Sequence, residues 1–350
     1  MSRPVSAFLA VAFLCLSVVP AVAELTPLAD AAHQALQALP RDPPPPALTR
    51  DSHYWVSNED RLELFEPHIR GKKGVLIGVG TDQNYLFAGW AQSEVLVLMD
   101  FDEAISDLHE VYALVFADTP DHTKFIEAWG PANVDALNAK ITAKFSDPAR
   151  QKRVLRAYRT ARGTVERRLR KVLKSFTKKG VRSFLDDAAQ YAHVRDLWAK
   201  RRVVALRGDL TAKDTLQAIA RVVREQGWTV GVFYPSNAEQ YFPMLPQYRE
   251  NVLALPADDA SVVIRTMGWG TLYGQADATY HYNVQPLKLF QTWAREGKAK
   301  SAGHMLRWRK PSDIVGFSTF EKLPGAEPTP SIAPKKPEAA TAPESAPATP

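Results

Sequence analysis

Short apolar segments alternate with helical segments along the middle of this chain, and this alternation constrains the fold more than any other feature. An apolar segment at 74–78 precedes a helical stretch at 83–92, and another at 94–100 precedes one at 103–117. Further strand patterns occupy 202–207, 229–234, 260–265 and 279–284, and a further helix 212–226. Continuous apolar strands separated by helices are typical of a mostly parallel sheet covered on both faces. The sequence therefore predicts an α/β fold.

Composition divides the rest of the chain into distinct segments. Residues 24–50 form a Pro-rich lead whose run of four prolines favours a stiff, extended spacer. The α/β domain is expected over 51–322, with 118–200 as a helical, basic insertion or cap on the sheet. Residues 323–350 are rich in Pro, Ala, Glu, Ser and Thr, so they cannot bury a core and are predicted to be disordered.

The first 23 residues have the layout of a cleaved secretory signal peptide. Arg3 precedes an apolar run from Ala7 to Val19, and small residues follow at Ala21 and Ala23. The run is short for a membrane span, although an uncleaved anchor is the alternative. The sequence thus predicts export to the periplasm or the exterior. Because the chain's one cysteine lies in this segment, the exported domain would lack disulfides, thiolate zinc sites and a cysteine nucleophile.

A strongly basic helix is predicted over 144–182, a segment that contains fifteen lysines and arginines and only two acids. Apolar residues recur at helical spacing, so one stripe of this helix should pack inward. Three interpretations stay open. The helix could rest against an acidic surface of the same protein, or it could bind anionic lipid or an anionic envelope polymer. Binding to nucleic acid is the third, and export argues against it.

The turn after the first predicted strand has the features of a ligand-binding loop. Glycines there allow a sharp turn and a close approach of a ligand to the backbone, and an acid at the end of the next strand can accept from ribose hydroxyls. The candidate residues are Gly78, Gly80, Thr81, Asp82, Asn84 and Asp100. Gln83 stands where the third glycine of a G-x-G-x-x-G motif would lie, so pure turn chemistry is the alternative.

Polar residues also follow two later strands, at Asp209, Ser236 and Asn237. The carboxyl ends of parallel strands meet at one edge of a sheet, so these residues are expected near the same crevice, although each could instead cap a helix. Ser236 lacks the flanking glycines of a hydrolase nucleophile. His109 is expected to be structural and His281 is a weaker crevice candidate; the histidine spacing indicates no metal site.

The combined layout resembles the class I S-adenosylmethionine-dependent methyltransferases, which have a Rossmann-like sheet. The segments 78–85, 206–210 and 234–242 look more closely like those of an uncharacterised bacterial family with that fold, and the resemblance covers about 50–285. It implies that Gly78, Gly80 and Asp100 surround the cofactor, with Asp209 on its adenine side.

Two functional hypotheses follow, and whether the protein is an enzyme stays open. The first is an S-adenosylmethionine-dependent methyltransferase or a close relative that binds a small molecule in the crevice. Export would remove the domain from the cytoplasmic supply of this cofactor. The second hypothesis is therefore a non-catalytic envelope protein whose basic helix at 144–182 contacts anionic lipid or polymer.

Overall fold

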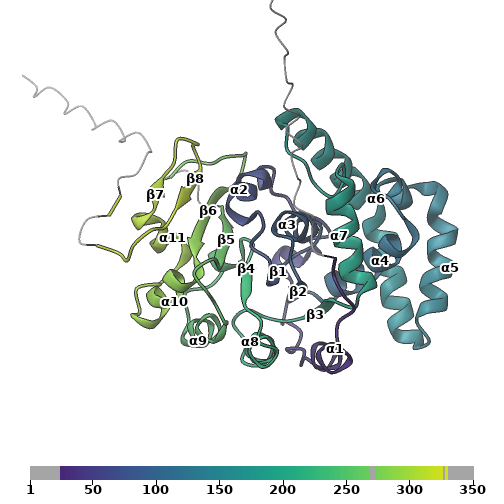
Figure 1. Cartoon of the computed structure of the whole chain (residues 1–350), viewed down its shortest axis with the longest axis horizontal. Coiled ribbons are helices and arrows are strands. Elements are labelled where there is room, and N and C mark those ends of the chain that lie inside the picture. The colour runs from purple at the N-terminus through teal and green to yellow at the C-terminus, as the bar shows by residue number, and fades with distance from the viewer. Residues whose placement is uncertain (1–23, 269–272, 326–327, 330–350) are drawn as a thin grey trace, which may run out of the picture.

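The computed structural model describes residues 24–268, 273–325 and 328–329, and these residues form an α/β structure around a central sheet (Figure 1). The sheet has eight strands in the order β3-β2-β1-β4-β5-β6-β8-β7. Their bounds are β1 Val75–Val79, β2 Val95–Asp100, β3 Val203–Arg207, β4 Val230–Tyr234, β5 Val262–Met267, β6 His281–Pro286, β7 Lys310–Pro311 and β8 Phe317–Thr319. All six strands predicted from the sequence are therefore present, within about two residues at each end.

The sheet is mixed, although most of its long strands are parallel. β3, β2, β1, β4 and β5 run parallel to one another, whereas β6 pairs antiparallel with β5. β8 is parallel to β6, and the two-residue β7 is antiparallel to β8. The prediction of a mostly parallel sheet is confirmed, but the segment at 279–284 is not the last strand. The five parallel strands follow the first five positions of the order found in doubly wound nucleotide-binding sheets.

Helices cover both faces of this sheet, as predicted. They are α1 Asp30–Gln37, α2 Glu66–Ile69, α3 Gln83–Ala91, α4 Glu103–Asp118, α5 Val134–Lys144, α6 Pro148–Lys179, α7 Ala188–Ala199, α8 Thr215–Glu225, α9 Pro246–Ala254, α10 Leu287–Arg295 and α11 Ala302–Met305. Two separate apolar cores result, one on each face. Both faces of the parallel strands are thus shielded from water, which explains their continuous apolar sequence.

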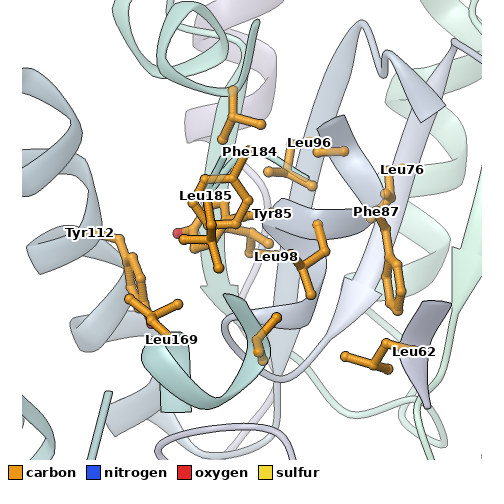
Figure 2. Close-up of a cluster of buried hydrophobic side chains, with 14 of the residues drawn as sticks. Leu62, Leu76, Tyr85, Phe87, Leu96, Leu98, Tyr112, Leu169, Phe184 and Leu185 are labelled. Atoms are coloured by element: carbon orange, nitrogen blue, oxygen red, sulfur yellow. The ribbon is translucent and has the colours of Figure 1, made fainter. Parts of the chain in front are cut away.

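The first core joins the sheet to α3, α4, α6 and α7. Figure 2 shows its centre, where Leu76, Leu96 and Leu98 from the strands lie near Tyr85 and Phe87 from α3, with Tyr112 and Leu169 contributed by α4 and α6. Aromatic rings fill much of this space, including those of the buried pair Tyr85 and Tyr112, whose ring centroids lie 4.9 Å apart. The second core lies against α1, α8, α9 and α10.

The helix α6 is the long basic helix that the sequence predicts. The Asp147 carboxylate caps its start by accepting from the Arg150 backbone N–H, and Gly180, with φ +67°, ends it in the left-handed conformation. Its buried stripe packs on α4 and α5, and α5 lies outermost beside α6 (Figure 1). Segment 118–200 therefore shares the first core with the sheet.

The Pro-rich lead packs along the sheet domain. Leu28, Ala32, Leu36 and Leu39 are buried in the second core, where α1 contacts α8. The Asp42 carboxylate then accepts hydrogen bonds from the backbone N–H groups of the loop after β3. The lead therefore covers the end of β3, an arrangement that its proline content did not predict.

Two sequence predictions concern the ends of the chain. The signal peptide at 1–23 lies outside the described residues, and so do residues 330–350 of the predicted tail. Within the described ranges, no helix combines the length and the apolar character needed to cross a membrane.

Candidate functional site

A cavity of about 560 Å³ opens at the carboxyl ends of β1, β2 and β4. This is the point where the strand order reverses direction, between β1 and β4, and it is where open α/β sheets bind ligands. The volume falls within the range of small-molecule sites. Its walls come from the turn after β1, the end of β2, the loop after β4, and two further segments, at 49–59 and 279–280.

The turn after β1 is held in shape by its own side chains. Gly80 has φ +90°, a conformation that L side chains rarely adopt. The Gln83 amide closes the turn, since its Nε2 donates to the Val79 carbonyl at 3.1 Å and its Oε1 accepts from the Thr81 N–H at 3.1 Å. The His109 ring reaches the Gly80 carbonyl at 2.9 Å. Gln83 thus stabilises the turn at the position where a third glycine was missing.

Asp100 lies at the end of β2 with its carboxyl group in the cavity wall. Burial raises the pKa of this carboxyl to about 7, while backbone N–H groups of Asp102, Gly80 and Phe101 lower it in part. The Asp102 N–H donates to its Oδ1 at 2.9 Å. Asp100 therefore changes charge near neutral pH, and it connects the turn after β1 to the start of α4.

Asp102 has a different role. Its Oδ1 accepts from the Ala104 N–H and so caps α4. Its Oδ2 lies 2.6 Å from the His53 ring nitrogen. Because His53 belongs to the segment before the sheet, this contact fastens 49–59 across the mouth of the cavity.

Glu59 is the most deeply buried acid in the cavity wall, with only 2% of its surface exposed. Its Oε1 accepts from the Tyr234 hydroxyl at 2.5 Å and from the Thr266 hydroxyl at 2.6 Å, and its Oε2 accepts from Ser57. Burial raises the pKa of Glu59, against the lowering effects of these hydroxyl groups and of Arg168. Hydroxyl donors from β4, from β5 and from segment 49–59, here called the strap, thus converge on one carboxyl group.

A second buried network places Glu59 there. The Asp82 carboxylate accepts from the Ser57 N–H at 2.7 Å and from Arg168 Nε at 3.1 Å. Arg168, on α6, also donates to the Glu59 carbonyl at 2.7 Å and to the Asp60 carboxylate at 3.3 Å. The turn after β1, the segment 57–60 and α6 are therefore joined beneath the cavity.

The structure brings five of the predicted site residues together. Those that line the cavity are Gly80, Thr81, Asp100, Ser236 and Asn237. Ser236 adopts φ +57°, an uncommon conformation for a residue with a side chain, and its backbone carbonyl accepts from the Thr266 N–H at 3.2 Å. The amide of Asn237 donates to the Tyr280 hydroxyl at 3.0 Å.

Four predicted site residues do not line the cavity, and each has another task. A Cβ at Gly78 would meet Asn84 Oδ1 at 1.9 Å, so Gly78 makes room for Asn84, whose Nδ2 donates to the Val79 carbonyl. Asp82 is occupied by Ser57 and Arg168. Asp209 accepts from both the N–H and the hydroxyl of Thr211. Asp209 is not among the residues that line this cavity, and its backbone N–H donates to the Asp42 carboxylate of the lead.

The two histidines singled out in the sequence are both buried and structural. His109 shares a hydrogen bond with the Tyr85 hydroxyl at 2.8 Å, as expected. His281 contacts the Gly274 carbonyl at 3.0 Å and the Ser318 hydroxyl at 2.8 Å, and it does not line the cavity. Within the described part of the chain, no three metal-binding side chains gather at one point.

Sequence reasoning missed the whole strap at 49–59, including Glu59. This segment forms no strand and carries no motif, and the partners of Glu59 lie 175 and 207 positions away. The available signal was a run of polar residues at 57–60 just before the first predicted strand. Such a run is typical of many loops, so it does not point to a site.

A family described as "Domain of unknown function (DUF7790)" matches residues 54–321, and the chain belongs to this family. The matched segment starts within the strap and includes both the sheet and the cavity walls from Tyr54 to Tyr280. No curated protein matches the sequence.

Proposed function

We propose that this member of the DUF7790 family binds S-adenosylmethionine or a closely related nucleoside, and that it is related to the class I methyltransferases. The observation that carries the proposal is the meeting of the Gly80 turn and the Asp100 carboxyl group at one cavity. A glycine turn after the first strand and an acid after the second are the two features that such sheets use to hold an adenosine ligand.

The residues present fit an adenosine group. Ribose hydroxyls could donate to the Asp100 carboxylate, and the apolar side chains of Phe101 and Ile105 offer a surface for the base. The parallel strand order supports this proposal, whereas the antiparallel β6 is a departure from a purely parallel sheet. Because Asp209 is withdrawn from the cavity, recognition of the adenine edge would depend on other lining residues.

S-adenosylmethionine would supply an electrophilic methyl group on a sulfonium centre. The chain's own contribution would be to bind and orient this molecule and to exclude water. The strap suits the last task, since Tyr54, Val56 and Ser57 all lie in the cavity wall. His53 and Asp102 hold this strap to the start of α4.

Calorimetry on residues 24–350 with S-adenosylmethionine and S-adenosylhomocysteine tests the proposal. We expect micromolar dissociation constants that weaken at least tenfold in Asp100→Ala. The matched control is Asp259→Ala, because the Asp259 side chain is 96% exposed and lies in an ion pair with Lys288, outside the cavity wall. Failure of both compounds to bind the unaltered domain would overturn the proposal.

A second candidate function rests on a specific feature of α6. Exposed cations follow one another at helical spacing on the face opposite its buried stripe. They are Lys152, Arg156, Arg159, Arg167, Lys174 and Lys178, here called the α6 cation stripe. Among the described residues none of the six forms an ion pair with an acid, although Arg159 contacts Asn138 and Arg167 contacts Thr164.

Except for Arg162, the other cations of α6 pair with acids of the protein. Arg150 pairs with Glu110, Arg153 with Asp107, and Lys171 with Asp60. This supports the interpretation that part of the helix rests on an acidic surface of the same chain. The six residues of the α6 cation stripe have no such acid partners among the described residues. We propose that this stripe contacts anionic lipid or an anionic envelope polymer.

Sedimentation with vesicles of anionic or of zwitterionic lipid tests this second function. We expect binding to the anionic vesicles that weakens about tenfold when Lys152, Arg156, Lys174 and Lys178 become glutamine. A matched control removes four exposed lysines that already pair with acids, namely Lys124, Lys288, Lys298 and Lys310. An equal loss of vesicle binding in both variants would show that only the net charge of the protein matters, which would overturn the proposal. Unchanged binding in the first variant would also overturn it.

Export is part of this second proposal, since an envelope partner requires it. We propose that residues 1–23 direct secretion and are removed after Ala23. Mass spectrometry of the protein recovered from its producing cells would then find an N-terminus at Glu24. A chain that retains residues 1–23 in the cytoplasm would contradict this.

A further inference from the structure

The Glu59 carboxylate has an unused acceptor position in the cavity wall. An ionised carboxylate offers about four such positions. Three are filled by short hydrogen bonds, from Tyr234 and Thr266 to Oε1 and from Ser57 to Oε2. The fourth hydroxyl, that of Ser236, lies 3.5 Å from Oε1, which is too long for a strong hydrogen bond. Oε1 thus already has two donors, and the position that remains for a further donor is on Oε2.

The charge around Glu59 is not balanced by the residues near it. Arg168 donates to the Glu59 backbone carbonyl and pairs with Asp82 and Asp60, so its guanidinium does not bond to the carboxylate. No described cation lies within ion-pair distance of Glu59 Oε1 or Oε2. A buried carboxylate without an ion-pair partner is costly, and burial raises the pKa of Glu59 although the nearby Arg168 lowers it in part. A cationic ligand group would remove that cost.

The cavity as a whole also favours a cation over an anion. Its wall contains three acids, Glu59, Asp100 and Asp102, against one arginine, Arg50. One of these acids, Asp102, already has a partner, since its carboxylate contacts the His53 ring. Hydroxyl and amide oxygens of Ser236 and Asn237 lie in the same wall and can accept further hydrogen bonds.

We propose that Glu59 and Ser236 form an ammonium-binding subsite, and that the second ligand of this cavity is a small primary amine. An ammonium group has three donors, which match the free position on Glu59, the Ser236 hydroxyl and one further oxygen of the wall. This inference deepens the proposed function, since the amine would be a second molecule that lies beside the nucleoside.

The position of the subsite is consistent with a cavity that holds a nucleoside at one end and an amine at the other. Asp100 ends β2, whereas Glu59 is bonded to residues of β4 and β5. β1 lies between β2 and β4, so the strand that ends in Asp100 and the strand whose Tyr234 contacts Glu59 are two strand spacings apart, about 10 Å. That separation leaves room for a nucleoside at Asp100 and an amine at Glu59. An ammonium group carried by the nucleoside ligand itself is the other source to be distinguished.

Calorimetry with four probes on residues 24–350 tests the subsite. The probes are 5′-methylthioadenosine, which lacks an ammonium group, S-adenosylhomocysteine, which carries one, 1,4-diaminobutane, and its neutral analogue 1,4-butanediol. The variants are Glu59→Gln, which keeps the side-chain shape, and Ser236→Ala, which leaves the three short hydrogen bonds of Glu59 in place. Asp259→Ala serves as the control for charge removal.

We expect 1,4-diaminobutane to bind and 1,4-butanediol not to bind, with the diamine at least tenfold weaker in Glu59→Gln and about threefold weaker in Ser236→Ala. A different result would be that Glu59→Gln loses affinity for S-adenosylhomocysteine but not for 5′-methylthioadenosine, and that the diamine does not bind. This would assign the ammonium to the nucleoside and overturn the assignment to a second ligand. If neither amine nor nucleoside affinity depends on Glu59, the subsite itself is overturned.

The two proposals fail separately in this experiment. Binding of 5′-methylthioadenosine tests the nucleoside site alone, because this probe has no group for Glu59. If the diamine binds through Glu59 but 5′-methylthioadenosine does not bind, the subsite proposal stands and the proposed function is overturned. If Glu59→Gln does not fold, Ser236→Ala decides, and undiminished diamine affinity in that variant contradicts the subsite.

Discussion

Arg168 Nε donates to the Asp82 carboxylate at 3.1 Å, and both side chains are almost completely buried. The pair joins α6 to the turn after β1, although the two residues lie 86 positions apart. Asp82 also holds the Ser57 N–H, and Arg168 holds the Glu59 carbonyl. The most basic helix of the protein thus supports the cavity from beneath, with an arginine that is not available to any partner.

Removal of this arginine should destabilise the fold strongly. Arg168→Met leaves the Asp82 carboxylate buried without its cation, and we expect the free energy of unfolding to fall by about 3–5 kcal/mol. Urea unfolding followed by circular dichroism measures this. Arg167→Met is the control, since Arg167 is exposed and contacts only Thr164. Equal midpoints for the two variants would contradict the buried-pair interpretation.

Asp100→Asn should become more stable than the parent protein as the pH rises. The pKa of Asp100 in the fold is about 7 against an ordinary value of 3.8, so the fold favours the protonated form. That stabilisation is complete below pH 4 and is lost as the pH rises through 7. We expect the advantage of Asp100→Asn in unfolding free energy to be about 3 kcal/mol larger at pH 8.5 than at pH 5. An advantage that is the same at both pH values would contradict this.

Nucleoside affinity should depend on pH through the same group. If ribose hydroxyls donate to ionised Asp100, the dissociation constant of 5′-methylthioadenosine should rise by up to about tenfold per pH unit below 7 and be constant above pH 8. Calorimetry between pH 5.5 and 8.5 measures it. The dependence should vanish in Asp100→Asn, whose residual affinity is low at every pH. A pH profile that survives this substitution would assign the titration to another group.

Gly80→Ala should disturb the turn after β1 more than an equivalent change elsewhere. Its φ is +90°, and an added Cβ would lie 2.3 Å from Gln83 Nε2, which must then release the Val79 carbonyl. We expect a loss of about 2–4 kcal/mol in unfolding free energy, from conformational strain and the broken hydrogen bonds. Gly71→Ala is the matched control, because Gly71 has φ +65° but no atom within 4 Å of the added Cβ.

The control separates the two costs of the Gly80 change. Gly71→Ala should lose only the conformational part, about 1–2 kcal/mol. If both variants unfold at the same urea concentration, the contact with Gln83 contributes nothing, and the amide would not be what shapes the turn.

Much of the sheet could be predicted because its signals are local. Each parallel strand is a short apolar run with helical sequence on either side, and burial on both faces makes that run continuous. Gly80 and Asp100 could be predicted for the same reason, since each stands at a fixed distance from a strand end. The antiparallel β6 was found as a strand, but its direction depends on its neighbour β5.

By itself, then, the sequence determined the alternation of strands and helices, the long basic helix, and the Gly80 and Asp100 side of the cavity. Only the tertiary structure decided that Asp42 of the lead covers the loop at Asp209, and that the strap brings Glu59 to Tyr234 and Thr266. Periodicity and turn chemistry act over a few residues, whereas these hydrogen bonds join groups more than 160 positions apart. Such partners are selected by the packing of the whole chain, because each buried carboxyl group must find donors wherever the fold places it.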